Sequence, residues 1–157
     1  MLAERIMVTK LVTAQEDECV GEVLSRMRKT SLRMLPVLDQ DHQVVGIFST
    51  TSILSYIVPD YIVSGDLDQV SYAPDMGVLH KHYDALADHQ VSTVMEDRPL
   101  LISPKDSLLS VAASLVSLAK HEYAVVVDEQ RRILGVISSG DLLDFLSECS
   151  LNEYDDA

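Results

Sequence analysis

The sequence predicts an α+β protein made of two copies of one unit, each with the element order β-α-β-β-α, packed on each other by pseudo-twofold symmetry. Two observations predict this. The string LPVLD at residues 35–39 returns as AVVVD at residues 124–128, and VVGIFSTTS at residues 44–52 returns as ILGVISSGD at residues 133–141. Both pairs are offset by 89 residues, so the copies align without a gap. A stacked solenoid needs about three or more repeats, so two copies favour a mutually packed pair.

In the first copy, residues 11–12 are the predicted first strand, and the acidic residues 14–17 are the predicted opening of a helix, where the helix dipole favours negative charge. Apolar residues then recur at helical spacing and are expected to face a core: Cys19, Val20, Val23, Leu24 and Met27. Two short strands joined by a polar turn at residues 39–43 follow, and a last helix is expected to begin near Ser49.

The second copy repeats this order. Residues 100–102 are the predicted strand, and Pro104 indicates a first helical turn with Ser103 as its cap. A polar turn at residues 128–132 joins the next two strands, and the last helix is expected to begin near Ser138.

These patterns predict a first domain at residues 5–58, a connector at residues 59–91, a second domain at residues 92–148 and an acidic tail at residues 149–157. The connector is expected to contain a helix at residues 78–89, because Leu79, Tyr83, Leu86 and Ala87 share one helical face.

Charge and hydropathy exclude several classes of function. Twelve basic and 25 acidic residues give a net charge of −13, which opposes binding to nucleic acid or to an anionic membrane. No stretch approaches the roughly 20 apolar residues of a membrane span, and the first ten residues do not resemble a secretory signal, so a cytoplasmic location and no membrane insertion are expected. Cys19 and Cys149 have no metal-type spacing and are expected to be reduced.

The strand ending in Asp39 or Asp128 and the closing pattern Gly-x-x-Ser, with an aspartate three residues further in the second copy, resemble the CBS domain, named for cystathionine β-synthase. Two such domains in tandem resemble a Bateman module. The resemblance covers roughly residues 5–55 and 92–148. It implies a regulatory module that binds an adenosine-containing ligand in the cleft between the repeats: AMP, ADP, ATP or S-adenosylmethionine.

Carried over by position, the resemblance assigns the ribose motif to Ser138 and Asp141, and an aspartate one turn beyond a capping serine can accept both ribose hydroxyls. Val136 and Ile137 are expected beside the adenine. The resemblance implies that Ile102 and Ser103 close the base pocket through backbone contacts.

The first copy departs from this pattern, because Ser49 matches but Ser52 stands where aspartate is expected. Arg33 matches a position that some members use to hold phosphates, whereas the second copy has Glu122 and Tyr123 nearby. The nucleotide is therefore expected to bind mainly at the site of Ser138 and Asp141. With one arginine available, AMP or ADP is favoured over ATP.

The residues also have plainer interpretations. Ser138 and Asp141 can serve only as a helix cap, and Arg33 as a surface charge. On that interpretation, the chain is a ligand-independent scaffold for dimerisation or docking. A metal site or small hydrolase built on His80, His82 and His89 is disfavoured, because only the last two share a helical face.

No catalytic motif is present, so an enzyme is not expected. The signal is expected to pass, through a ligand-dependent conformational change, to an unidentified effector protein or to a second copy in a homodimer. No cofactor is required beyond the regulatory nucleotide.

Overall fold

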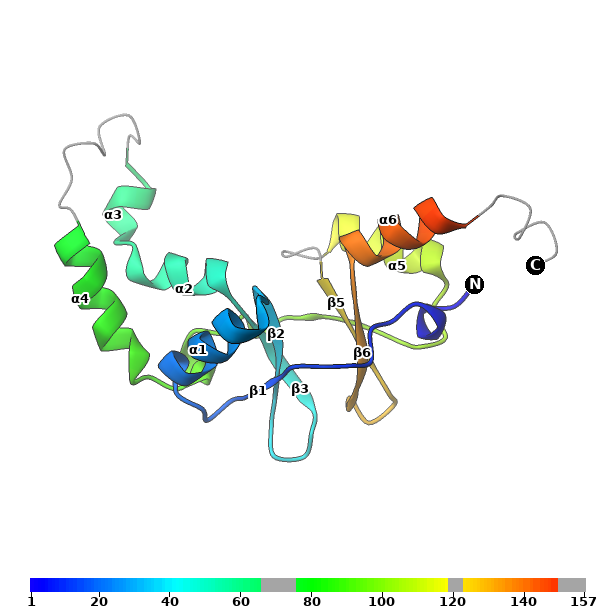
Figure 1. The fold of residues 1–157 in the computed structure, drawn as a ribbon, viewed down its shortest axis with the longest axis horizontal. Helices are drawn as coiled ribbons and strands as arrows, with labels where there is room; N and C mark the ends of the chain where they lie inside the picture. The colour runs from blue at the N-terminus through cyan, green and yellow to red at the C-terminus, as the bar shows by residue number, and fades with distance from the viewer. Residues whose placement is uncertain (66–75, 119–122, 150–157) are drawn as a thin grey trace. The chain divides into compact units, whose positions relative to one another are not determined.

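A computed structural model describes residues 1–65, 76–118 and 123–149 (Figure 1). Glu122 and the predicted tail beyond Cys149 lie outside the described residues. The predicted α+β class and the two β-α-β-β-α copies are confirmed. The elements in chain order are η1 (Ala3–Arg5), β1 (Ala14–Gln15), α1 (Val20–Thr30), β2 (Met34–Leu38), β3 (Val44–Ser49), α2 (Thr50–Ile57), α3 (Asp60–Val63), α4 (Met76–Ala87), η3 (Val91–Thr93), β4 (Leu100–Ile102), α5 (Leu108–Ser117), β5 (Tyr123–Val127), β6 (Ile133–Ser138) and α6 (Ser139–Glu148).

Each copy forms a three-stranded sheet, in the order β1-β2-β3 or β4-β5-β6. In the second sheet β4 runs parallel to β5, and β5 runs antiparallel to β6. The register places Ser138, the last residue of β6, opposite Tyr123 at the start of β5. The carboxyl end of β6 and the start of α6 therefore lie beside the amino end of β5.

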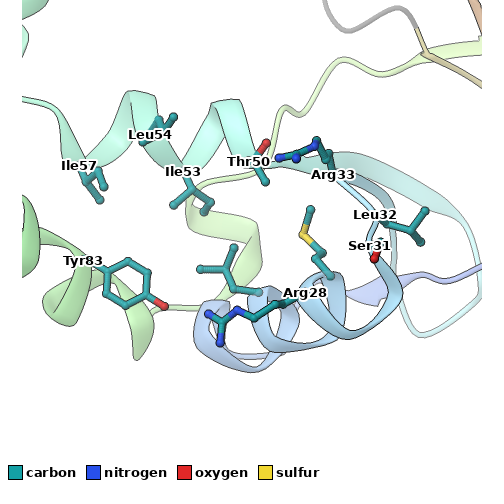
Figure 2. Close-up of a pocket in the computed structure, with 11 residues that line it drawn as sticks. Arg28, Ser31, Leu32, Arg33, Thr50, Ile53, Leu54, Ile57 and Tyr83 are labelled. Atoms are coloured by element: carbon teal, nitrogen blue, oxygen red, sulfur yellow. The ribbon is translucent and has the colours of Figure 1, made fainter.

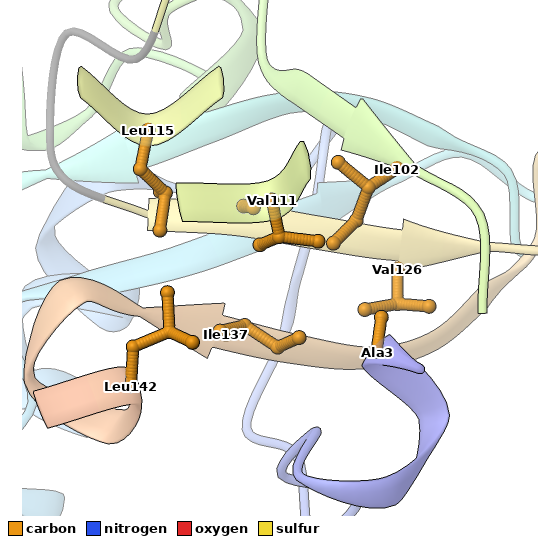
Figure 3. Packing of buried hydrophobic residues seen from close by; sticks show 8 residues of the cluster. Ala3, Ile102, Val111, Leu115, Val126, Ile137 and Leu142 are labelled. Carbon is orange, nitrogen blue, oxygen red and sulfur yellow. The ribbon is translucent and has the colours of Figure 1, made fainter. Parts of the chain in front are cut away.

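The core of the second sheet lies under α5 and α6 (Figure 3). Each of its buried residues is at most 7% exposed: Ala3, Ile102, Val111, Leu115, Ala124, Val126, Ile137 and Leu142. Strand residues alternate between faces, so Ile137 points into this core while its neighbours on β6 point to the other face. Ala3 reaches the same core from η1, near the start of the chain.

The compact units of the molecule do not coincide with the two sequence copies. One unit combines Met1–Val12, Leu38–Val45 and Arg98–Ala157, and the other combines Thr13–Val37 with Gly46–Asp97. The first segment of each copy therefore packs in the unit that contains the sheet of the other copy.

Backbone hydrogen bonds account for this arrangement, in which the first segments of the two copies are exchanged between the units. Val8 pairs with Val136 of β6 through two hydrogen bonds, from Val8 N to Val136 O (2.9 Å) and from Val136 N to Val8 O (3.0 Å). In the other unit, Ile47 N donates to Glu96 O (2.9 Å) and Glu96 N donates to Ile47 O (2.8 Å). Each exchanged segment thus adds one bridge to the strand that closes the other copy's sheet.

The exchange also accounts for the two aligned glycines. A Cβ atom on Gly46 would lie 2.7 Å from Glu96 O, and one on Gly135 would lie 2.9 Å from Val8 O. Real Cβ atoms essentially never approach a carbonyl oxygen this closely, so only glycine lets the exchanged backbone cross at these points.

The turn between β2 and β3 contacts the turn between β5 and β6. Val44 N donates to Arg131 O (3.0 Å), and Arg131 Nε donates back to Val44 O (2.9 Å). His42 and Arg131 occupy equivalent turn positions and both have positive φ, 61° and 64°. The tip of the first hairpin accordingly belongs to the unit of the second sheet.

The first strand and first helix of the first copy begin later than predicted. The strand is Ala14–Gln15 rather than residues 11–12, and α1 begins at Val20 rather than in the acidic residues 14–17. Glu18 holds a turn instead: its Oε1 accepts from Gln15 N (2.8 Å), and its carboxylate pairs with Arg26.

The predicted cap of the second copy was also wrong. α5 begins at Leu108, and Ser107 is its cap, accepting from Ser110 N at 3.1 Å. Ser103 lies in the preceding turn, where its hydroxyl accepts from Lys105 N (3.2 Å).

The caps predicted at Ser49 and Ser138 are confirmed, since both side chains accept a hydrogen bond from the third residue of their helices. The connector helix is α4, Met76–Ala87, which packs against α1 and α2 (Figure 1).

Candidate functional site

The start of α6 carries the predicted ribose motif. Ser138 Oγ accepts from Asp141 N (3.1 Å), and Asp141 Oδ2 accepts from Ser138 N (2.8 Å), which makes a reciprocal capping box. Both residues are half-buried. Within the described part of the chain, Asp141 Oδ1 accepts no hydrogen bond, so this fixed carboxylate has acceptor capacity to spare.

Tyr123 lies next to this motif, directly opposite Ser138 on the neighbouring strand. Burial raises the pKa of the Tyr123 phenol, and the negative charge of Asp141 raises it further. The phenol therefore stays protonated at neutral pH and remains a hydrogen-bond donor beside an acceptor-only carboxylate. Sequence reasoning treated Tyr123 only as a poor phosphate ligand and missed this proximity to Asp141.

The exchanged segment adds residues that sequence reasoning missed altogether. Val8 pairs with Val136, two positions before Ser138, and the Met7 side chain lies against Gly135. The aligned glycines were the signal that a backbone crosses β6 here. The resemblance gave no indication that this backbone comes from the start of the chain.

Val136 and Ile137 occupy opposite faces of β6. Val136 is 7% exposed, on the face away from the helices, and Ile137 is fully buried in the core with Val111 and Leu142 (Figure 3). The side chain of Ile137 is therefore part of the packing that positions the motif.

Ile102 and Ser103 do not lie at the same end of the sheet as Ser138. Ile102 pairs with Val126, three residues along β5 from Tyr123, or about 10 Å at the usual rise of a strand. They line a separate pocket of about 500 Å³ together with Leu101, Pro104, Lys105, Val127, Asp128 and Glu129.

Arg33, Ser49 and Ser52 lie together in the other unit. Thr50 N, at the start of α2, donates to Arg33 O (3.1 Å). Ser49 is 2% exposed, and its hydroxyl accepts from Ser52 N (3.1 Å) and shares a hydrogen bond with Ser52 Oγ (2.9 Å). The two hydroxyls thus satisfy each other, and no carboxylate of the described residues bonds to either.

The Arg33 side chain lines a groove of about 510 Å³ between α1 and α2 (Figure 2). It is exposed and has no ion pair among the described residues. The structure therefore divides the predicted site residues into three groups: the start of α6, the end of β4, and the start of α2.

The histidines of α4 make local contacts. His80 Nδ1 pairs with Asp84 Oδ2 (2.9 Å), and His82 Nδ1 donates a hydrogen bond to Ile57 O (2.8 Å). Across the three described segments, no three histidine, cysteine or acidic side chains gather as metal ligands. Among the same residues, no helix has the length and hydropathy needed to cross a bilayer.

Two relatives match this chain over most of its length. An uncharacterized protein of Methanocaldococcus jannaschii is 24% identical over 154 residues, covering 93% of this chain and 91% of the relative. A CBS domain-containing protein of Dictyostelium discoideum is 23% identical over 146 residues, with the same coverage of both chains.

Solved structures share the fold. A CBS domain-containing protein of unknown function from Bacillus anthracis superposes with a TM-score of 0.73 at 18% identity, covering 96% of this chain and 95% of that one. CBSX2 in complex with AMP gives a TM-score of 0.70 at 19% identity, covering 94% of this chain and 96% of that chain. The CBS domain profile itself matches residues 3–59 and 91–148. The chain therefore belongs to the CBS domain family, as a tandem pair of CBS domains.

Proposed function

We propose that this CBS pair is a regulatory sensor of an adenosine nucleotide, AMP or ADP in preference to ATP, with Ser138 and Asp141 as the ribose-binding motif. The observation that carries the proposal is the capping box at the start of α6. It fixes the Asp141 carboxylate and leaves Oδ1 able to accept hydrogen bonds. A carboxylate is an acceptor-only group with several lone pairs, which suits the two donor hydroxyls of a ribose.

Neighbouring groups support the same assignment. The protonated Tyr123 phenol lies beside Asp141 and offers a donor to a polar ligand atom. The exchanged segment borders β6 through Val8 and Met7 and adds apolar surface and backbone next to the motif. CBSX2, which shares the fold, has been solved with AMP.

The phosphate of the nucleotide is harder to match. The net charge of −13 repels phosphates, and a triphosphate needs more positive charge than one arginine supplies. Arg33 lies beside the start of α2, at the first-copy counterpart of the Ser138 motif. This distribution favours a ligand with few phosphates.

The signal would pass to a separate effector protein through a change in conformation. A ligand can shift a conformational equilibrium only by its differential affinity for the two states. The effector is therefore expected to recognise a surface that differs between the ligand-free and the ligand-bound protein.

Isothermal titration calorimetry with AMP, ADP, ATP and S-adenosylmethionine tests the proposal. Asp141→Asn keeps an oxygen that can accept from Ser138 N but removes the charge, so affinity is expected to fall about 10- to 100-fold, the cost of one or two charge-assisted hydrogen bonds. Asp144→Asn is the matched control, because Asp144 is exposed on the same helix and its carboxylate has no partner in the described chain.

The ligand series distinguishes the alternatives. Binding of S-adenosylmethionine alone, lost in Asp141→Asn, would keep the site and change the ligand. Absence of binding by all four compounds would overturn the sensor and favour the ligand-independent scaffold. The self-satisfied Ser49 and Ser52 hydroxyls, with no aspartate, already fit a scaffold at the first copy.

A further inference from the structure

Each exchanged segment carries a methionine at the point where it bridges to the sheet of the other copy. Met7 and Met95 are 88 positions apart, close to the repeat offset. Met7 immediately precedes Val8, whose bridge to β6 is the first crossing, and Met95 immediately precedes Glu96, whose bridge to β3 is the second crossing. The two methionines therefore hold equivalent places, one in each compact unit.

Both thioethers fill space that a side chain would otherwise take on the bridged strand. A Cβ atom placed on Gly135 would lie 3.0 Å from both Cγ and Sδ of Met7. One placed on Gly46 would lie 2.7 Å from Sδ and 3.0 Å from Cγ of Met95. Each sulfur therefore lies beside a glycine of β6 or β3, and the close packing at each crossing depends on a compact apolar group there.

The two methionines remain partly accessible to solvent. Met7 and Met95 are half-buried, whereas Met27 of α1 is 3% exposed. An oxidant in solution can therefore reach the first two side chains in the folded protein more readily than the third. Susceptibility to oxidation follows exposure, so these two residues are open to chemistry from which Met27 is protected.

The backbone amides at both crossings are already paired. Val8 N and Val136 N each donate to the carbonyl oxygen of the other residue, at 2.9 and 3.0 Å, and Ile47 N and Glu96 N do the same at 2.9 and 2.8 Å. An oxygen added to either sulfur would find no free donor among these amides, and a buried polar atom without a partner is costly. The modified side chain would have to leave its glycine or displace a bridge.

We propose that Met7 and Met95 are a pair of oxidation sites, and that their conversion to sulfoxides loosens the crossing in each unit. The co-reactant is a peroxide. A sulfur lone pair attacks one oxygen of hydrogen peroxide, the O–O bond breaks, and the proton on the transferred oxygen passes to the departing hydroxide to give water. The thioether is oxidised by two electrons and the peroxide is reduced. The product is polar where the thioether was apolar, and methionine sulfoxide reductases reverse the change.

The first crossing borders the proposed ribose motif. Val136 precedes Ser138 by two positions on β6, so a loosened crossing would also free the strand that leads into the capping box. This consequence for nucleotide binding rests on the proposed function. The loosening itself does not, because it is measured at the backbone bridges, and failure of the protein to bind AMP would leave that measurement unaffected.

Hydrogen exchange at the four bridging amides tests the proposal in the full chain. After limited treatment with hydrogen peroxide, peptide mapping by mass spectrometry should find one added oxygen on Met7 and on Met95 but none on Met27. NMR-detected exchange at the two bridging amides of each crossing should accelerate about tenfold or more, because loss of packing favours local opening. Methionine sulfoxide reductases should restore slow exchange, which they would not do if the exposed Cys19 had been oxidised instead.

Two leucine variants provide matched controls, because leucine has nearly the volume of methionine and no sulfur. In Met7→Leu, peroxide should leave exchange slow at the first crossing and still accelerate it at the second. Met95→Leu should give the reverse, and Met27→Leu should protect neither crossing. Circular dichroism before and after treatment checks that each variant stays folded, so that accelerated exchange reports a local opening.

The other outcomes overturn the proposal. Sulfoxides at Met7 and Met95 with unchanged exchange would show that the crossings tolerate the added oxygen. Oxidation of the 38% exposed Met1 without oxidation of these two residues would show that the fold protects them. Acceleration that survives both leucine substitutions would place its cause at another residue.

Discussion

The starts of α2 and α6 share one capping hydrogen bond but differ in chemistry. In both, a serine at the cap accepts from the third helical residue, Ser52 in one copy and Asp141 in the other. Ser52 shares its hydroxyl with Ser49, so that cap is neutral and closed. Asp141 gives one oxygen to the cap and keeps the other available. A cap therefore becomes a candidate binding site through one residue, while the fold around it stays the same.

The largest effect on stability is expected at Gly46 and Gly135, where an exchanged backbone segment passes close to the glycine in each copy. Gly46→Ala should lower the free energy of unfolding by about 1–3 kcal/mol or more, because its Cβ would meet Glu96 O at 2.7 Å. Gly135→Ala should cost somewhat less, since the distance to Val8 O is 2.9 Å. Urea denaturation measures both. Gly140→Ala is the control, because a Cβ at this position would have ordinary van der Waals contact with Ser138 Oγ, at 3.6 Å. Equal stability of all three variants would contradict the exchange of segments.

An intermediate effect is expected when the first cap is given the chemistry of the second. Ser52→Asp should build a capping box with Ser49 and place a carboxylate near the positive end of the α2 dipole, raising stability by about 0.5–1 kcal/mol. If the proposed ribose motif is correct, calorimetry should also detect a second nucleotide equivalent. Unchanged stoichiometry would mean that the first copy lacks more than the aspartate.

The smallest effect on stability is expected in the turn that precedes α1, where Glu18 pairs with Arg26. Hydrogen bonding to Arg26 lowers the pKa of Glu18 in the folded protein, against the opposing effect of burial. Because this pKa is depressed, the pair stabilises the fold above the unfolded pKa, near 4.5, and its contribution is lost as the pH falls through the folded value. Glu18→Gln should cost only about 0.2–0.5 kcal/mol at neutral pH, since the pair is partly exposed.

Asp106 is the equivalent acid in the second copy, and Asp106→Asn is the control for this pH effect. Asp106 accepts from Ser103 N (2.9 Å) and has no arginine partner in the described chain. Denaturation as a function of pH should show a smaller difference from the unmodified chain below pH 4.5 for Glu18→Gln than at neutral pH. A difference that does not vary with pH would rule out the Glu18 charge as its cause.

Local signals in the sequence predicted local structure well. The caps at Ser49 and Ser138 depend on residues within one helical turn, and both are confirmed. The start of α1 was misplaced because the dipole argument for acidic residues ignored Arg26, eight residues away, which holds Glu18 in a turn. Ser103 was predicted as the cap because Pro104 indicated a first helical turn, whereas the observed cap is Ser107.

Long-range features could not be predicted from the repeat. The duplication shows that two segments are alike, but it does not show which copy each one packs with, so the pairing of Val8 with Val136 was missed. The candidate site shows the same limit. Residues that the resemblance assigned to one binding site, such as Ile102 and Ser138, lie at opposite ends of a sheet, because sequence order does not give strand register.

The exchange of segments also constrains how the chain folds during synthesis. Residues 1–12 are synthesised before their partner strand β6, which is made more than 120 residues later. The unit that contains them therefore cannot close until β6 has emerged, and its contacts have high sequence separation. The other unit needs only the segment ending at Asp97. On the ribosome, the unit containing the first sheet is expected to become native first, while the N-terminal segment waits for its partner.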